Sequence, residues 1–338
     1  MKMKIKNFIC CAILLTTASF VKGQDIHFSQ FFASPFLLNP ANAGFINCDY
    51  RFTGVYRNQW NSVPVPYSSF AATGDIRFIK GKVGRDLLGV GMMAQTDKAG
   101  DLALSSNQFG LDLAYNKNLD RFGIQYLGGG LLLNYATGSF DMSKAVTGSM
   151  ITPSGTISGT FPWSHGATYN YIDVSAGAQW SWIPDHQNNF TIGAAAYHLN
   201  KPLKSFEGNS NSKISTKIVV NASGQFKLSP RVDLYPKAMY TLQGPYHETD
   251  LGSFARINLA SLHNTDYAIY LGSWYRLGDA FYPVFRVDMN GLSLGFSYDV
   301  NVSSLKGLSE IYGGPELSLI YIGCLPGMNS KQVFCPRF

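Results

Sequence analysis

Residues 281–302, with the sequence FYPVFRVDMNGLSLGFSYDVNV, constrain the fold more than any other stretch of this chain. Asn290-Gly291 predicts a two-residue hairpin turn, because both central residues of a type I′ turn need positive φ. On each side of the turn, apolar residues alternate with small or polar ones, which sorts them onto opposite faces of a strand. In a soluble sandwich the apolar face would point into a core. In an outer-membrane barrel it faces lipid, and the polar face lines the lumen.

The composition departs from that of a typical soluble domain. Charged residues make up 14% of the 338 residues, whereas about 25% is usual. The 34 glycines, 19 tyrosines and 23 phenylalanines suit twisted strands and interfacial aromatic side chains. Four of the 27 basic residues lie in the first 22 positions, so the rest of the chain carries 23 basic and 21 acidic residues. This balance gives no indication of nucleic-acid binding.

Residues 1–23 are predicted to be a secretory signal peptide. Lys2, Lys4 and Lys6 precede a short apolar run at residues 8–15, and Gly23 precedes the expected cleavage before Gln24. No lipid-anchored N-terminus is expected, because the cysteines at positions 10 and 11 start the apolar run rather than mark the cleavage point. Downstream there is no run of 18 apolar residues, so no transmembrane helix is predicted.

Fourteen candidate strands follow one another within residues 48–322, an even number, as single-chain bacterial barrels require. When the connections between successive strands are numbered along the chain, the even-numbered ones are short. The three longest, at residues 137–167, 198–212 and 303–315, are all odd-numbered. This sorting is typical of extracellular loops opposite short periplasmic turns. The predicted fold class is therefore all-β: a transmembrane antiparallel outer-membrane β-barrel of about 14 strands.

The segments outside the barrel and its longest loop are less regular. Residues 24–47 are predicted to be an ordered extended segment, periplasmic or lumenal, because Pro35, Pro40 and Gly44 interrupt any regular element. Residues 323–338 are predicted to be a periplasmic C-terminal tail. Residues 137–167 contain large apolar side chains, which favours partial order, either as a lumenal plug or as a contact for a partner.

Three cysteines remain after the predicted cleavage: Cys48, Cys324 and Cys335. Outside the cytosol, Cys324 and Cys335 are the candidate disulfide, with ten residues between them. Cys48 is then free or exchanged into the pair, and the alternative is that all three are reduced and buried. The spacing predicts no metal site, and no cofactor is expected.

Six residues are candidate contacts for a partner, and each has a plainer interpretation. Tyr56, Arg57, Gln59 and Trp60 could form a lumenal or rim contact, or Arg57 could pair with a lumenal carboxylate such as Asp75 or Asp299 while Trp60 sits in the aromatic belt. His198 and Pro202 could dock a partner or a loop, or simply cap a strand end. Catalysis is not predicted, because no GxSxG elbow accompanies His198, which is the only strand histidine.

Six fragments, with the two pieces of the opening segment counted as one, occur in an order that resembles the PorP/SprF-type outer-membrane proteins of the type IX secretion and gliding system. The opening segment carries FSQ at 28–30 and NPANAG at 39–44, and the first strand carries GVYRNQW at 54–60. The later fragments are HLNKP at 198–202, LGFSYDVNVSSL at 294–305, GPELSL at 314–319 and CPRF at 335–338. The resemblance covers essentially the whole chain after the signal peptide.

The resemblance implies a noncatalytic barrel in the outer membrane of a Gram-negative bacterium. Such a barrel binds the C-terminal domain of a large secreted adhesin and supports its export and anchoring at the cell surface, and attachment is favoured over a role as a secretion component. A periplasmic peptidoglycan-binding lipoprotein, other type IX components and outer-membrane lipid are the further partners considered. The alternatives are a passive porin for small solutes and an outer-membrane lipid-modifying enzyme.

Overall fold

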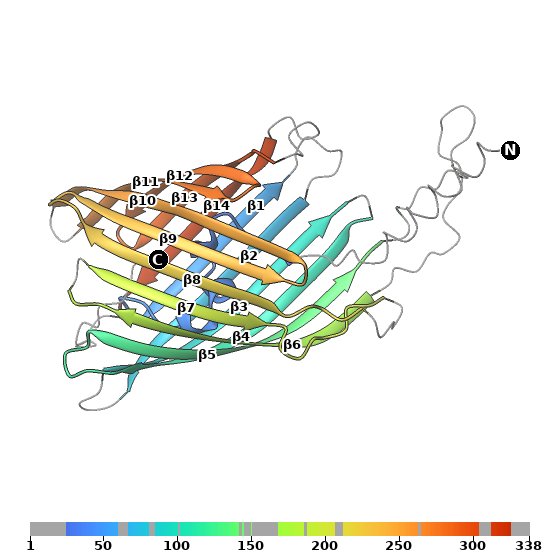
Figure 1. Ribbon diagram of the computed structural model, residues 1–338, viewed down its shortest axis with the longest axis horizontal. Coiled ribbons are helices and arrows are strands. Elements are labelled where there is room, and N and C mark those ends of the chain that lie inside the picture. The colour runs from blue at the N-terminus through green and yellow to red at the C-terminus, as the bar shows by residue number, and fades with distance from the viewer. Residues whose placement is uncertain are drawn as a thin grey trace.

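The described residues form a closed barrel of fourteen antiparallel strands (Figure 1). The computed structural model describes residues 25–59, 67–80, 85–100, 102–141, 144, 150, 168–185, 188–206, 212–262, 265–303 and 312–325. Each strand pairs with its neighbours in sequence, and the first strand pairs with the last. The strands are β1 Tyr50–Gln59, β2 Tyr67–Lys80, β3 Asp86–Ala99, β4 Leu104–Asn118, β5 Gln125–Ser139, β6 Thr168–Trp182, β7 Asn189–Tyr197, β8 Lys217–Lys227, β9 Val232–Gln243, β10 Tyr246–Leu262, β11 Thr265–Arg276, β12 Ala280–Met289, β13 Leu292–Asn301 and β14 Tyr312–Gly323.

The hairpin at residues 281–302 has the geometry that its sequence predicts. Asn290 and Gly291 have φ values of 49° and 84°, as a type I′ turn requires. Beyond the turn, Leu294 and Phe296 are 43% and 46% exposed on the outer surface, while Ser297 is buried on the lumenal side. The prediction of an outer-membrane barrel with apolar residues outside and polar residues inside is confirmed.

The two ends of the barrel differ in the lengths of their connections. At the end where β1 begins and β14 finishes, here called the terminal end, the six connections contain between two and six residues. The opposite end, here called the loop end, carries the three longest connections, which join β5 to β6, β7 to β8 and β13 to β14. Most of the first of these, including the predicted plug or partner contact, lies outside the described residues. No described helix is long and apolar enough to cross a membrane.

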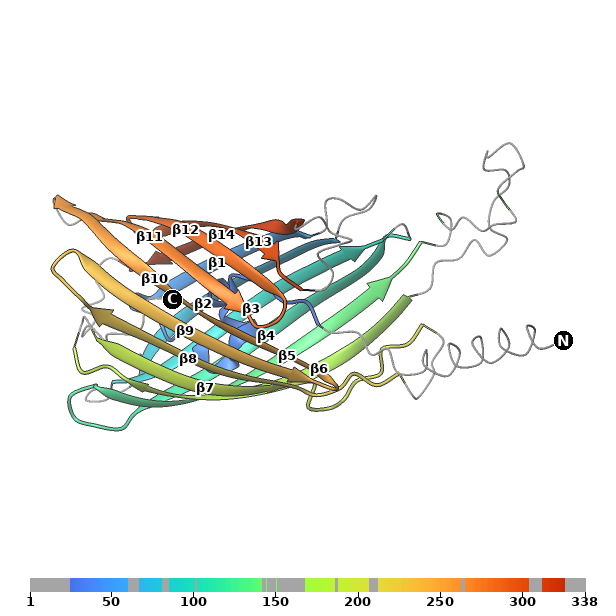
Figure 2. The same cartoon turned by 45° about the horizontal axis from the view of Figure 1, so that its top comes forward.

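Residues 25–47, here called the lumenal segment, lie inside the barrel (Figure 2). The segment contains three single-turn helices, η2 Phe31–Ala33, α2 Pro35–Leu38 and η3 Pro40–Asn42. Pro35 and Pro40 each begin a helix, where the missing N–H costs nothing. The Asn39 side chain accepts a hydrogen bond from the Ala41 N–H at 2.9 Å and so caps η3.

Candidate functional site

The candidate site is the contact between the lumenal segment and the barrel wall. From Phe28 to Ile46, every residue except Leu37 is buried. The aromatic side chains of the segment pack on the wall: the Phe32 ring lies 5.1 Å from Phe254 and 5.3 Å from Trp274, centroid to centroid. The lumen is therefore filled at this level by the protein's own chain.

Glycines on the inner surface of the wall make room for the segment. At Gly89 on β3 an added Cβ would overlap the backbone carbonyl of Ala43, and at Gly130 on β5 it would overlap the backbone of Pro40 and Ala41. A side chain at either position would displace the segment, so these strands need glycine there. Gly130 ends a run of three glycines at residues 128–130, and the wall approaches the segment closely there.

The residues of the FSQ fragment are bound by the last strand. Both oxygens of the Glu316 carboxylate accept backbone hydrogen bonds, from the N–H of Ser29 at 2.8 Å and of Gln30 at 2.6 Å. The Gln30 side chain donates to the Glu316 carbonyl at 3.2 Å and accepts from the Ser318 hydroxyl at 2.6 Å. A buried carboxylate that accepts two N–H groups is well stabilised, and it satisfies two donors that would otherwise be unpaired.

Asp299 links the same fragment to two arginines of the wall. It accepts hydrogen bonds from the Ser29 hydroxyl at 2.7 Å and from the Arg57 guanidinium at 2.8 Å. Arg57 also donates to the His27 carbonyl at 2.7 Å, and Arg276 donates to the Ser29 hydroxyl at 3.1 Å. These groups are buried, so removing one partner would leave an uncompensated charge in the lumen.

A second set of ion pairs holds the segment near the terminal end. Arg51 forms a bidentate pair with Asp75, with N–O distances of 2.9 and 3.0 Å, and donates to the Asn42 carbonyl at 3.0 Å. Asp75 in turn accepts from the Gly44 N–H at 2.8 Å. The NPANAG fragment is thus bound by β1 and β2, whereas FSQ is bound by β11, β13 and β14.

A cluster of charged side chains around His198 holds the segment at the loop end. The His198 ring, which follows β7, lies with Nε2 2.7 Å from the Asp25 carboxylate and Nδ1 2.9 Å from Asp173. Lys217 lies 3.9 Å from Asp25. Burial alone would lower the pKa of His198, but the hydrogen bonds and charges of Asp173 and Asp25 raise it to about 9. His198 is therefore charged at neutral pH and keeps the pKa of Asp25 well below its usual value.

Five of the six fragments that carry the resemblance meet in these contacts. Besides the two pieces of the opening segment, they supply Arg57, His198, Asp299 and Glu316. The sixth fragment, at 335–338, lies outside the described residues.

A family model described as "Type IX secretion system membrane protein PorP/SprF" matches residues 20–321. The chain belongs to this family. No curated protein matches it.

Three solved structures are similar to this chain at low sequence identity. A Pseudomonas aeruginosa FadL homologue is 12% identical, with 84% of this chain and 92% of that chain covered and a TM-score of 0.48. The Ralstonia pickettii toluene transporter TbuX is 11% identical, with 85% and 92% covered and a TM-score of 0.46. The monoaromatic hydrocarbon channel CymD is 9% identical, with 87% and 93% covered and a TM-score of 0.48.

In this PorP/SprF-family barrel the candidate contact residues occupy different places. Arg57 and His198 are buried in the lumen against the segment, and Arg57 pairs with Asp299, as its plainer interpretation expected. Tyr56 points outward and is 41% exposed on the lipid-facing surface. Gln59 is half-buried at the end of β1, Pro202 is buried, and Trp60 lies outside the described residues.

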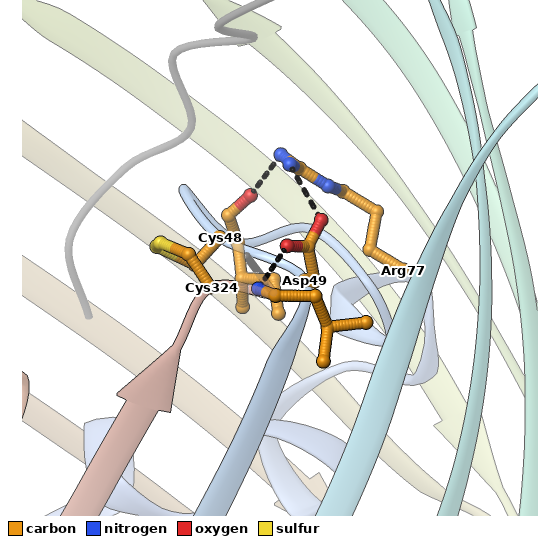
Figure 3. The surroundings of a disulfide bond; sticks show 6 residues. Cys48, Asp49, Arg77 and Cys324 are labelled. Carbon is orange, nitrogen blue, oxygen red and sulfur yellow. Dashed lines mark hydrogen bonds and ion pairs between the residues drawn. A yellow bond between two sulfur atoms is a disulfide. The ribbon is translucent and has the colours of Figure 1, made fainter. Parts of the chain in front are cut away.

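The predicted Cys324–Cys335 disulfide is wrong for Cys324, which is bonded to Cys48 (Figure 3). Cys48 lies just before β1 and Cys324 just after β14, and these strands pair at Tyr50 and Gly323. Barrel closure therefore brings the two cysteines to a Cα–Cα distance of 4.8 Å despite a separation of 276 residues. Beside them, Asp49 binds Arg77 and accepts from the Leu325 N–H at 2.7 Å. Cys335 lies outside the described residues.

The sequence interpretation missed Asp25, Arg276 and Glu316 as site residues. Each is a charged residue that a strand pattern or an irregular segment places in the lumen, and a lumenal charge needs a partner. Glu316 could have been identified from its need for a charged partner and from its position inside one of the family-like fragments.

Proposed function

We propose that this barrel is a noncatalytic anchor that binds the C-terminal domain of a large type IX-secreted adhesin and supports its export and attachment at the cell surface. The observation that supports this most is the filled lumen of a barrel that belongs to a type IX secretion family. A wall tied to its own internal segment through buried ion pairs is a rigid support for a partner.

The test is deletion of the gene, followed by quantification of the adhesin at the surface, in the medium and inside the cell. We expect the adhesin to be made but lost to the medium or retained unexported, and the wild-type gene to restore surface attachment. An adhesin that stayed fully attached in the deletion strain would overturn the proposal. A pull-down from detergent-solubilised outer membranes should recover the adhesin as the largest bound protein.

The passive porin is the main alternative. A barrel of fourteen strands is wide enough to conduct if its lumen is empty. The lumenal segment and its ion pairs argue against conduction in this conformation. Planar-bilayer recordings of the purified protein should give little steady conductance, and a large steady conductance would favour the porin instead.

A lipid-modifying enzyme has little support from the geometry around His198. Both of its ring nitrogens lie against carboxylates, so neither is placed to activate a serine hydroxyl. We expect the lipid profile of a null strain to match that of the parent, and a lost lipid modification restored by the wild-type gene but not by His198→Ala would support catalysis.

A further inference from the structure

The lumenal segment runs through the barrel in one direction, from the loop end to the terminal end. At its start, Asp25 contacts His198 after β7, Lys217 at the first position of β8 and Gln243 at the last position of β9. All three positions are at the loop end. At the other extreme, the Asp49 N–H donates to the carbonyl of Gly323, the last residue of β14, at 3.1 Å.

The contacts between these extremes shift from the loop-end part of the wall to its terminal-end part. His27 and Gln30 bind Arg57 and Glu316, which lie in the loop-end halves of β1 and β14. The Asn39 side chain then donates to the carbonyl of Ala178 on β6 at 3.0 Å. Further along, contacts to the terminal-end portions of the wall are made by Ala41 with Asn116 on β4, and by Asn42 with Arg51 on β1.

The loop end is the extracellular end by the rule for outer-membrane barrels. Such barrels have short periplasmic turns and longer extracellular loops. Here the three longest connections all lie at the end where Asp25 is bound. A segment that enters from the periplasm and plugs the lumen from below would have its first residue at the opposite end.

We propose that the chain before Asp25 leaves the barrel through its extracellular mouth, so that the N-terminal end produced by signal-peptide removal is displayed on the cell surface. The cluster of Asp25, His198 and Lys217 fixes the point of exit. This topology does not depend on the identity of any partner.

Labelling of single cysteines on intact cells tests the proposal. In a Cys335→Ser background, a five-residue insertion that carries one cysteine, placed between Gln24 and Asp25 and here called the inserted cysteine, is exposed to a membrane-impermeant maleimide before and after permeabilisation of the outer membrane. Gln24 stays at the predicted cleavage point, so no lipid-anchoring signal is created. Two controls define the sides: Lys213→Cys in the connection between β7 and β8, and Arg231→Cys in the turn between β8 and β9, both of which replace exposed side chains.

We expect the inserted cysteine and Lys213→Cys to be labelled on intact cells, and Arg231→Cys only after permeabilisation. Protection of the inserted cysteine on intact cells, with Lys213→Cys labelled, would overturn the proposal. Labelling of Arg231→Cys but not of Lys213→Cys would reverse the barrel and overturn it as well. An epitope tag before Asp25, detected by antibody on cells whose barrel shows normal heat-modifiability, gives a second measurement with the same expected result.

Discussion

The carboxylate of Glu316 accepts a hydrogen bond from the backbone N–H of Gln30 at 2.6 Å, although 286 residues separate the two in sequence. The same carboxylate accepts from the N–H of Ser29, so one side chain of the last strand binds two consecutive amides of the lumenal segment. The segment and the barrel wall are therefore one folded unit.

Glu316→Gln should loosen the segment without abolishing the barrel. A glutamine has one acceptor oxygen for two buried N–H groups, and leaving one unsatisfied costs about 1–3 kcal/mol. We expect a lower midpoint of thermal unfolding, measured by heat-modifiability, and more frequent channel openings in bilayers. Leu317→Ile, whose side chain faces lipid on the same strand, is the control and should behave as wild type. Equal behaviour of Glu316→Gln and wild type would contradict this role.

Gly130→Val should expel the segment from part of the lumen. Its Cβ would overlap the backbone of Pro40 and Ala41, whereas a valine is otherwise favourable in a strand. Overpacking of this kind costs roughly 1–3 kcal/mol or more. We expect a several-fold rise in single-channel conductance.

Gly129→Val supplies a matched control one residue away. Its Cβ would point outward and meet only the Gly177 carbonyl, at 3.9 Å. The conductance of Gly129→Val should remain at the wild-type level. A similar rise in both variants would show that valine disturbs β5 itself rather than the segment.

Cys324→Ser should destabilise the barrel, whereas Cys335→Ser should not. The Cys48–Cys324 bond closes a loop of almost the whole barrel, and disulfides contribute about 2–5 kcal/mol in the loop-entropy account. Peptide mapping without reductant should recover the 48–324 pair, and thermal unfolding should separate the two variants. Recovery of a 324–335 pair would contradict the assignment.

The contact between His198 and Asp25 should weaken as the pH rises. The pKa of His198 is raised from 6.5 to about 9 in the folded protein, so its contribution is complete below about 6.5 and is lost as the pH rises through about 9. The full effect is at most about 3 kcal/mol. We expect the midpoint temperature of thermal unfolding to decrease as the pH is raised from 6.5 to 9.5.

His198→Asn is the control for this pH dependence, because asparagine tolerates the positive φ of 58° at this position. The variant should be less stable at pH 6.5 and should lose most of the decline between pH 6.5 and 9.5. An unchanged decline in His198→Asn would assign the pH dependence to other groups.

Much of the barrel could be predicted from the sequence, because its determinants are local. Period-two alternation, the Asn290-Gly291 turn and the sorting of connection lengths are each visible in a short stretch of the chain. They gave the strand number and the inner and outer faces. The same pattern says nothing about what fills the space inside, because a polar lumenal face suits water and protein equally.

The candidate site depends on contacts between residues far apart in sequence. Asp25 meets His198 and Ser29 meets Glu316 only after the barrel has closed. The cysteine pairing failed for the same reason: ten intervening residues favoured Cys335, whereas closure of the barrel brings Cys48 to Cys324. Arg57 was the exception, since a lumenal arginine needs a carboxylate, and Asp299 was one of the two candidates that the sequence analysis named.

The lumenal segment is held by contacts at Asp25, at Gln30, at Asn42 and beside Asp49, so its length must match the height of the barrel wall. One residue added between Gln30 and Asn39 would shift every later residue of the segment away from the wall residue that binds it. The connections at the outer mouth can vary in length, but the length of the lumenal segment is fixed by the barrel that surrounds it.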